Sequence, residues 1–226
     1  MDPSFFARFG LYIEPQLLDA DTCAQVRAAM DDAQQVEATI EDEGTYEVDR
    51  SHRKTRLAKM DPETLAVVRD RLNSLRETLS GHFDLELQEC EKPQFLVYEE
   101  GDFFRPHMDS SDKDADEASG RRVSAVIFLN ETSEEPAAGA YGGGSLSFYG
   151  LLQDDPKGEG IGLPLVGSPG ALVAFPSQMI HGVSPVTHGR RYTIASWFPT
   201  GDQLTTSGAV PNMKETRGRA ELPAKP

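Results

Sequence analysis

Hydrophobic residues in the first 92 positions follow helical spacing. Residues 61–81 place one apolar side chain every three or four positions, which predicts a helix with one buried face. Asp61 and Pro62 are typical of a helix start, and Gly81 is expected to end this helix. A second helix is predicted over about residues 21–38. The polar residues 41–59 between the two helices predict a solvated loop.

From residue 93 onward the pattern changes to short hydrophobic runs separated by glycine and proline. Strands are predicted at residues 94–98, 103–107, 123–130, 145–148, 171–175 and 192–198. The run 123–130 is apolar on both faces, as expected for a central strand that is covered on both sides. Many short strands with turn signals are typical of a sandwich or barrel. The predicted fold class is therefore mainly β with N-terminal helices.

The chain length indicates one structural domain. A domain of 226 residues buries roughly 70% of the surface that its unfolded chain exposes. Within it we expect a helical support region over residues 1–92, a β core over residues 93–200 and a loosely held tail over residues 201–226.

Composition excludes some functions. Lys and Arg number 22 and Asp and Glu number 37, so the formal net charge is −15, which argues against nucleic acid or an anionic membrane as partner. No apolar run approaches 18 residues and no secretory signal is recognised, so we expect a cytoplasmic protein. Cys23 and Cys90 are expected to be buried packing residues.

Candidate chemistry gathers at His107 and Asp109. One residue separates them, so on a strand both side chains point to the same face. Together with a histidine from a distant strand, they would form three ligands on one face of an octahedral metal site, the arrangement of non-haem iron(II) oxygenases. The pair alone is a weak signal, because such residues often form only local hydrogen bonds.

The segment 181–191 offers the missing groups. His181 is expected at the end of one strand, and Arg191 follows ten residues later at the start of the next. A planar guanidinium at that place can hold a carboxylate through two hydrogen bonds at the base of a metal pocket. The neighbouring Arg190 should point to the opposite face of the strand.

Five segments carry a family resemblance: residues 98–109, 122–130, 143–148, 170–176 and 181–197. Together they resemble the iron(II)- and 2-oxoglutarate-dependent dioxygenases, specifically the prolyl 4-hydroxylase-like branch. They appear in the family's order and cover about residues 93–199. The last segment also resembles the bacterial PKHD-type hydroxylases, in which Pro-Val-Thr precedes the anchoring arginine.

The resemblance implies a double-stranded β-helix, a cupin-like jelly-roll barrel supported by helices on one sheet. It implies Fe(II) ligands His107, Asp109 and His181, and binding of 2-oxoglutarate by Arg191 and Tyr98. Iron(II), 2-oxoglutarate and O2 are the implied cofactor and cosubstrates, with ascorbate as an optional reductant. Some relatives have a second tyrosine at the position that we assign to Leu129, so one cosubstrate hydrogen bond is expected to be missing or supplied elsewhere.

Substrate-binding residues are less well specified. Arg122 is a candidate at the barrel mouth, and Trp197 is a candidate because it shares a strand face with Arg191. Their alternatives are pairing with acidic loops for Arg122 and a core position for Trp197. The basic residues at positions 50–56 either face substrate or neutralise neighbouring carboxylates, and residues 109–120 are a candidate lid.

The expected activity is hydroxylation of a C–H bond, in a prolyl residue of a peptide or protein or in a free amino acid, with release of succinate and CO2. The expected partners are therefore 2-oxoglutarate and a small-molecule or peptidyl substrate. One alternative is a catalytically idle or sensory relative that binds a partner. Another is a cupin-like metal protein with other chemistry, which would favour more histidines on the paired strands. Neither the substrate nor the oligomeric state follows from the sequence.

Overall fold

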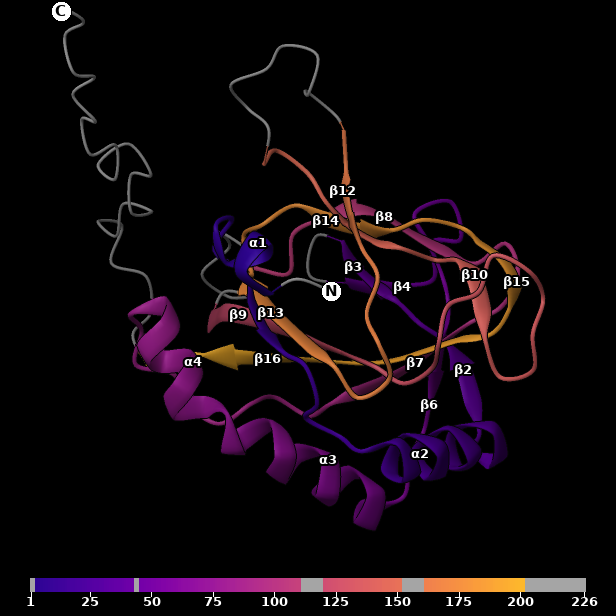
Figure 1. Ribbon diagram of the computed structural model, residues 1–226, viewed down its shortest axis with the longest axis horizontal. Coiled ribbons are helices and arrows are strands. Elements are labelled where there is room, and N and C mark those ends of the chain that lie inside the picture. The colour runs from indigo at the N-terminus through magenta and orange to yellow at the C-terminus, as the bar shows by residue number, and fades with distance from the viewer. Residues whose placement is uncertain (1–2, 43–44, 111–119, 152–160, 202–226) are drawn as a thin grey trace, which may run out of the picture.

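The fold was analysed in a computed structural model (Figure 1). It describes residues 3–42, 45–110, 120–151 and 161–201, although not the side chains of residues 3, 40–42 and 45–47. The predicted tail and most of the candidate lid lie outside the described residues. Among the described helices, none is long and apolar enough to cross a membrane.

The larger of two main sheets has seven strands. Their order is β1 (Tyr12–Glu14), β13 (Leu172–Pro176), β9 (Arg121–Phe128), β16 (Arg191–Pro199), β7 (Gln94–Tyr98), β6 (Arg56–Ala58) and β2 (Gln35–Glu37). Every neighbouring pair is antiparallel. The long strand β16 hydrogen-bonds to both β7 and β9 and so holds the middle of this sheet together.

The smaller main sheet has five strands. Their order is β12 (Leu163–Leu165), β11 (Leu146–Phe148), β14 (His181–Val183), β8 (Phe103–His107) and β5 (Arg53–Lys54). Two further pairs are formed by β10 (Tyr141–Gly143) with β15 (Val186–Gly189) and by β3 (Ile40–Asp42) with β4 (Thr45–Glu47). The two main sheets enclose an apolar interior that includes Phe128, Phe148 and Phe175. This architecture confirms the predicted double-stranded β-helix.

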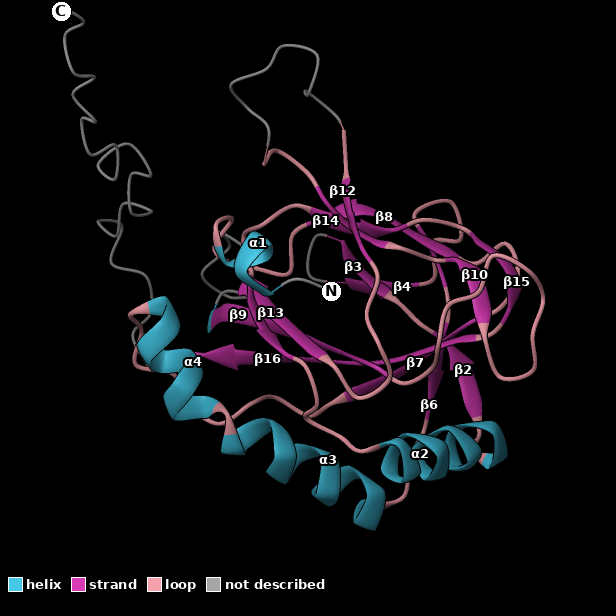
Figure 2. Cartoon of the chain, viewed as in Figure 1, coloured by secondary structure: helices cyan, strands magenta, loops and turns pink. Residues whose placement is uncertain are grey.

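Helices cover the outer face of the larger sheet (Figure 2). They are α2 (Ala20–Asp32), α3 (Pro62–Ser74) and α4 (Arg76–Phe83), whereas the short α1 (Pro3–Ala7) precedes β1. In β9, Val123 and Ile127 pack against these helices, while Phe128 packs inside the barrel. The prediction of a central strand with two covered faces is confirmed.

The helix boundaries differ from the predicted ones. Helix α2 ends at Asp32, because Ala33 is already extended and residues 35–37 form strand β2. The long predicted helix is interrupted at Leu75 and continues as α4, so Gly81 lies inside a helix. Asp84 takes the left-handed position after the helix, with φ of 53°, that Gly81 was expected to occupy.

The prediction of a loop over residues 41–59 is wrong. Its second half supplies β5 to the smaller sheet and β6 to the larger one. Strand β5 is a charged edge strand, which is typical of protected sheet edges, whereas β6 lies between β7 and β2. Both strands are too short to carry a hydrophobic pattern. Residues 1–92 thus contribute strands as well as helices, while the domain boundaries at residues 92 and 200 stay a prediction.

Candidate metal centre

The two candidate histidines lie on neighbouring strands of the smaller sheet. His107 closes β8 and His181 opens β14, and the two are directly paired across the sheet. His181 therefore begins a strand, where a strand end was expected. Asp109 follows β8, and its backbone N–H donates to the carbonyl oxygen of Ser177 at 2.9 Å.

Asp109 lies between the two imidazoles. His107 Nε2 is 3.4 Å from Asp109 Oδ1, and His181 Nε2 is 3.4 Å from Asp109 Oδ2. The three ligand atoms all lie within 4.8 Å of one another. The pairing of β8 with β14 thus places the three predicted ligands side by side, so that their donor atoms face each other.

Both imidazoles are held so that Nε2 is available for a metal. His107 Nδ1 bonds to the carbonyl oxygen of Arg105 at 2.8 Å, and His181 Nδ1 bonds to that of Met179 at 2.9 Å. A carbonyl oxygen only accepts, so each Nδ1 carries the proton and each neutral ring presents the lone pair of Nε2. The donor set fits Fe(II), which nitrogen and carboxylate ligands of this kind bind.

Electrostatics keep this donor set in its ligating form. Burial alone would raise the pKa of Asp109, but His181, His107 and Trp197 outweigh burial and hold that pKa well below its ordinary range. Burial lowers the pKa of His181 to about 4, against the opposing attraction of Asp109. At neutral pH the site therefore offers one carboxylate and a neutral His181.

Neighbouring side chains fix the Asp109 carboxylate. Ser124 donates a hydrogen bond from its hydroxyl to Asp109 Oδ2 at 2.7 Å, and the Ser124 and Ser177 hydroxyls are 3.0 Å apart. Trp197 pairs with Ser124 across the larger sheet and also acts as a hydrogen-bond donor to Asp109. Such supporting donors hold a ligand in the orientation that the metal requires.

Arg191 is the largest buried cation near this centre. Its side chain is 1% exposed, and Arg191 pairs with Tyr98 across β16 and β7. Its Nη1 donates to Thr193 Oγ1 at 3.2 Å, and its Nε is enclosed without a hydrogen-bond partner. Within the described residues no carboxylate pairs with this guanidinium, so it offers a buried positive charge to a bound anion.

Aromatic rings form the walls around this guanidinium. Its carbon lies 5.0 Å from the ring centroid of Tyr98 and 5.7 Å from that of Phe128. Leu129, where a second tyrosine was considered, instead packs on the helix side of the sheet. The residue of this strand that faces Arg191 is Phe128, which provides a ring without a hydroxyl.

The remaining sequence candidates occupy different places. Arg190 points outward and pairs with Asp31 and Glu99, as the alternation of strand faces predicts. Arg122 is partly buried and donates to the carbonyl oxygen of Arg121 at 3.1 Å. Trp197 is 7% exposed and supports a candidate ligand, so its expected role as a substrate wall stays a prediction.

Sequence reasoning missed two residues around the centre and did not single out a third. Ser124 was hidden in an apolar strand, although it is a hydroxyl residue on the inward face beside Val126 and Phe128. Phe104 stacks on His107 with ring centroids 3.6 Å apart, which no spacing rule for strands predicts. Arg53 was noted only as one of a basic cluster, and its guanidinium lies 4.6 Å from the Phe104 centroid.

Part of this sequence is similar to the sequences of known proteins. The model of the 2OG-Fe(II) oxygenase superfamily matches residues 93–199. A PKHD-type hydroxylase of Shewanella oneidensis is 34% identical over 107 residues, which are 47% of this chain and 42% of that protein. The chain thus spans about half the length of this curated relative.

Solved structures share the fold. The chain is similar to a prolyl-4-hydroxylase of Pseudomonas putida, with a TM-score of 0.64, 23% identity, and coverage of 88% of this chain and 97% of that one. It is also similar to a prolyl hydroxylase of Trichoplax adhaerens in complex with a peptide fragment of hypoxia inducible factor. There the TM-score is 0.61 with 18% identity, covering 87% of this chain and 86% of that one.

Proposed function

Over residues 93–199 the chain belongs to the 2OG-Fe(II) oxygenase superfamily, and from this we propose that it is an Fe(II)- and 2-oxoglutarate-dependent hydroxylase. The observation that carries the proposal is the coexistence of two features in one barrel. One is the group of His107, Asp109 and His181, whose ligand atoms face each other. The other is the buried charge of Arg191, which pairs with no carboxylate in the part of the chain that the structure describes.

Each residue has a definite task in this proposal. The Nε2 atoms of His107 and His181 and the carboxylate of Asp109 would hold Fe(II), and Arg191 with Tyr98 would hold the distal carboxylate of 2-oxoglutarate. Iron and 2-oxoglutarate, when bound, supply the O2-dependent oxidation of a substrate C–H bond, with succinate and CO2 as coproducts. No further catalytic residue is proposed.

The protein environment favours such chemistry. Phe175 lies edge-on to the His181 ring with centroids 4.7 Å apart, and Phe148 is the next ring at 6.4 Å. These rings exclude water from one side of the centre and lower its local dielectric constant. Charge interactions inside are stronger as a result, including the one between Arg191 and a bound carboxylate.

The substrate proposed first is a prolyl residue in a peptide or protein, and the second is a free amino acid. Support comes from the names of the similar proteins, since two of them are prolyl hydroxylases and one of these holds a peptide fragment. Ascorbate as a reductant and a cytoplasmic location rest on the sequence analysis alone. A binding protein without catalysis would need neither three converging ligands nor a buried arginine, so this alternative is not favoured.

The test measures succinate formation by the purified protein with Fe(II), 2-oxoglutarate and O2. A panel of proline, prolyl peptides and other free amino acids is compared with a reaction without substrate. Asp109→Ala serves as the inactive control and Asp70→Ala, an exposed position on α3, as the matched active one. Succinate formation that requires Fe(II) and Asp109 is expected, and its absence for the wild type under all conditions would contradict the proposal.

A further inference from the structure

Strand β5 brings a cation next to the metal centre. Arg53 pairs with Phe104 across β5 and β8, and β8 is the strand that ends in His107. The Phe104 ring contacts both residues, since His107 stacks on it at 3.6 Å and the Arg53 guanidinium carbon lies 4.6 Å from its centroid. The Phe104 ring therefore contacts both Arg53 and the candidate metal ligand His107.

Charge interactions also connect Arg53 with the interior of the site. Burial lowers the pKa of Arg53, and the groups that oppose this shift are Tyr98 and Asp109. Both of these belong to the candidate centre. The electrostatic environment of Arg53 therefore includes one candidate metal ligand.

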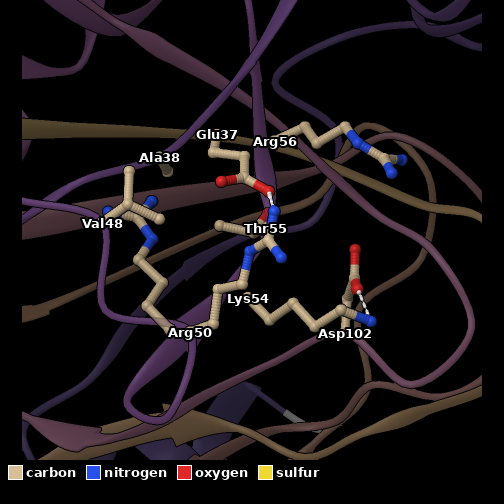
Figure 3. Close-up of a pocket in the computed structure, with 9 residues that line it drawn as sticks. Glu37, Ala38, Val48, Arg50, Lys54, Thr55, Arg56 and Asp102 are labelled. Atoms are coloured by element: carbon tan, nitrogen blue, oxygen red, sulfur yellow. Dashed lines mark hydrogen bonds and ion pairs between the residues drawn. The ribbon is translucent and has the colours of Figure 1, made fainter.

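Arg53 differs from the cations around it because none of the described residues is an acidic partner for it. It lines a pocket whose other lining residues include Arg50, Lys54 and Arg56. These three are labelled in Figure 3. Figure 3 shows Arg50 reaching Glu37 and Lys54 reaching Asp102, the latter at 2.9 Å. Arg56 pairs with Glu99. Within the described residues, Arg53 forms no such ion pair.

Its hydrogen-bond donors are also incompletely used. Arg53 Nη1 donates to the carbonyl oxygen of Thr39 at 3.1 Å, and the enclosed Nε has no partner. Elsewhere in the chain, Arg121 binds Glu91 through its Nε at 2.8 Å and its Nη2 at 2.7 Å. The corresponding edge of Arg53 makes no hydrogen bond to the described part of the chain. This edge is the one that binds a carboxylate side-on.

We propose that Arg53 binds a carboxylate of the substrate beside the metal centre and thereby selects acidic substrates. This inference rests on the proposed function and extends it to the substrate class. The carboxylate can come from an acidic side chain of a peptide or from a free amino acid. Arg53 is partly buried and forms no ion pair within the described residues, so a bound carboxylate would take up donors that the free protein leaves unused.

The experiment uses the full chain with Mn(II) in place of Fe(II), saturating 2-oxoglutarate and no O2, so that binding is read without turnover. The probe is a fluorescent blocked peptide, acetyl-Gly-Glu-Pro-Glu-Gly amide, compared by anisotropy with its twin carrying Gln for both Glu residues. Unlabelled L-proline and L-glutamate compete separately to distinguish a free amino acid from a peptide side chain. Arg53→Gln is the test variant and Arg50→Gln the matched control, on the same pocket but paired with Glu37.

The Glu peptide should bind at least tenfold more tightly than its twin, and Arg53→Gln should remove this difference while Arg50→Gln keeps it. The Nε–H signal of Arg53 in a nitrogen-15 NMR spectrum, assigned by its loss in Arg53→Gln, should move downfield when the Glu peptide or the competing amino acid binds. Arg53→Lys keeps the positive charge but loses the planar pair of hydrogen-bond donors. This variant should fold and should show an intermediate preference for the Glu peptide over its Gln twin.

Three results would overturn the inference: equal binding of the twin peptides, no carboxylate binding at all, or equal losses in the Arg53 and Arg50 variants. Loss of 2-oxoglutarate binding in Arg53→Gln would also overturn it, because Arg53 would then serve the cosubstrate. Failure of the proposed function is a separate result, namely a wild-type protein that binds no 2-oxoglutarate in the presence of the metal.

Discussion

The hydroxyl of Ser124 donates to Asp109 Oδ2 at 2.7 Å, which joins the larger sheet to the candidate metal centre. Asp109 follows β8 of the smaller sheet, whereas Ser124 lies in β9 of the larger one. This hydrogen bond therefore links the two main sheets inside the barrel. It fixes the carboxylate before any metal arrives, so that little side-chain freedom is lost on binding.

Ser124→Ala should weaken Fe(II) binding by roughly 10- to 100-fold, as is usual when a supporting hydrogen bond to a metal ligand is removed. The fold should persist, because alanine is smaller and fits the inward face of β9. Titration of the metal followed by equilibrium dialysis measures the change. Ser196→Ala is the control, since Ser196 is equally buried but its hydroxyl donates to the carbonyl oxygen of Glu91. Equal losses in the two variants would exclude a specific role for Ser124.

Arg191→Gln should raise the 2-oxoglutarate requirement by on the order of 100-fold or more, because losing one partner of a buried charge pair costs about 3–5 kcal/mol. Iron binding should not change, since Arg191 is not among the three converging ligands. Arg190→Gln, which removes only the exposed contacts with Asp31 and Glu99, should change the requirement by less than about fivefold. The dissociation constant of 2-oxoglutarate for the Mn(II) protein measures both.

The thiol of Cys23 should resist labelling in the folded protein. Burial raises the pKa of Cys23 to about 11, and its side chain is 1% exposed, so at pH 8 the thiol is protonated and inaccessible. Above pH 9 the unfolded chain releases this proton more readily than the folded one, so the folding stability falls as the pH rises from 9 through 11. Thiol-reagent kinetics with and without denaturant check the first statement. Rapid labelling of Cys23 in the native state would contradict it.

Gly170→Ala should destabilise the protein by about 2 kcal/mol or more. Gly170 has φ of +83°, and a Cβ there would lie 2.0 Å from the carbonyl oxygen of Leu18. Gly81→Ala is the opposite case, because it lies inside α4 with no atom near an added Cβ, and alanine there should stabilise by about 1 kcal/mol. Urea denaturation of the two variants measures both changes in the free energy of unfolding. Changes of the same sign would contradict the assigned difference between the two glycine positions.

Local spacing predicted the parts of the site that depend on strand alternation. His107 and Asp109 point to the same centre, and Arg190 and Arg191 point to opposite faces, as strand alternation predicts, although Asp109 follows β8 and Arg190 precedes β16. The double-stranded β-helix and the central position of residues 123–130 followed from resemblance and from hydrophobic pattern. These features need only neighbouring residues or a known family order.

Features that depend on distant pairing were not predicted. Arg53 lies beside the metal centre only because β5 pairs with β8, and two charged residues carry no hydrophobic signal for such a strand. The sequence analysis considered Leu129, but Phe128 is the residue beside Arg191, because a shift of one position along a strand reverses the face. Ser124 acquires its role from Asp109, fifteen residues earlier, through tertiary contact alone.

The cross-strand pairing of His107 with His181 has a consequence for biosynthesis. These residues are 74 positions apart, and the ribosome adds about 5–20 residues per second, so His181 appears roughly 4–15 s after His107. In the meantime the nascent chain holds only two of the three ligands, and Arg191 comes later still. The complete candidate ligand set therefore exists only after most strands of the barrel have been synthesised, so a metal can meet all three groups only late in translation or after it.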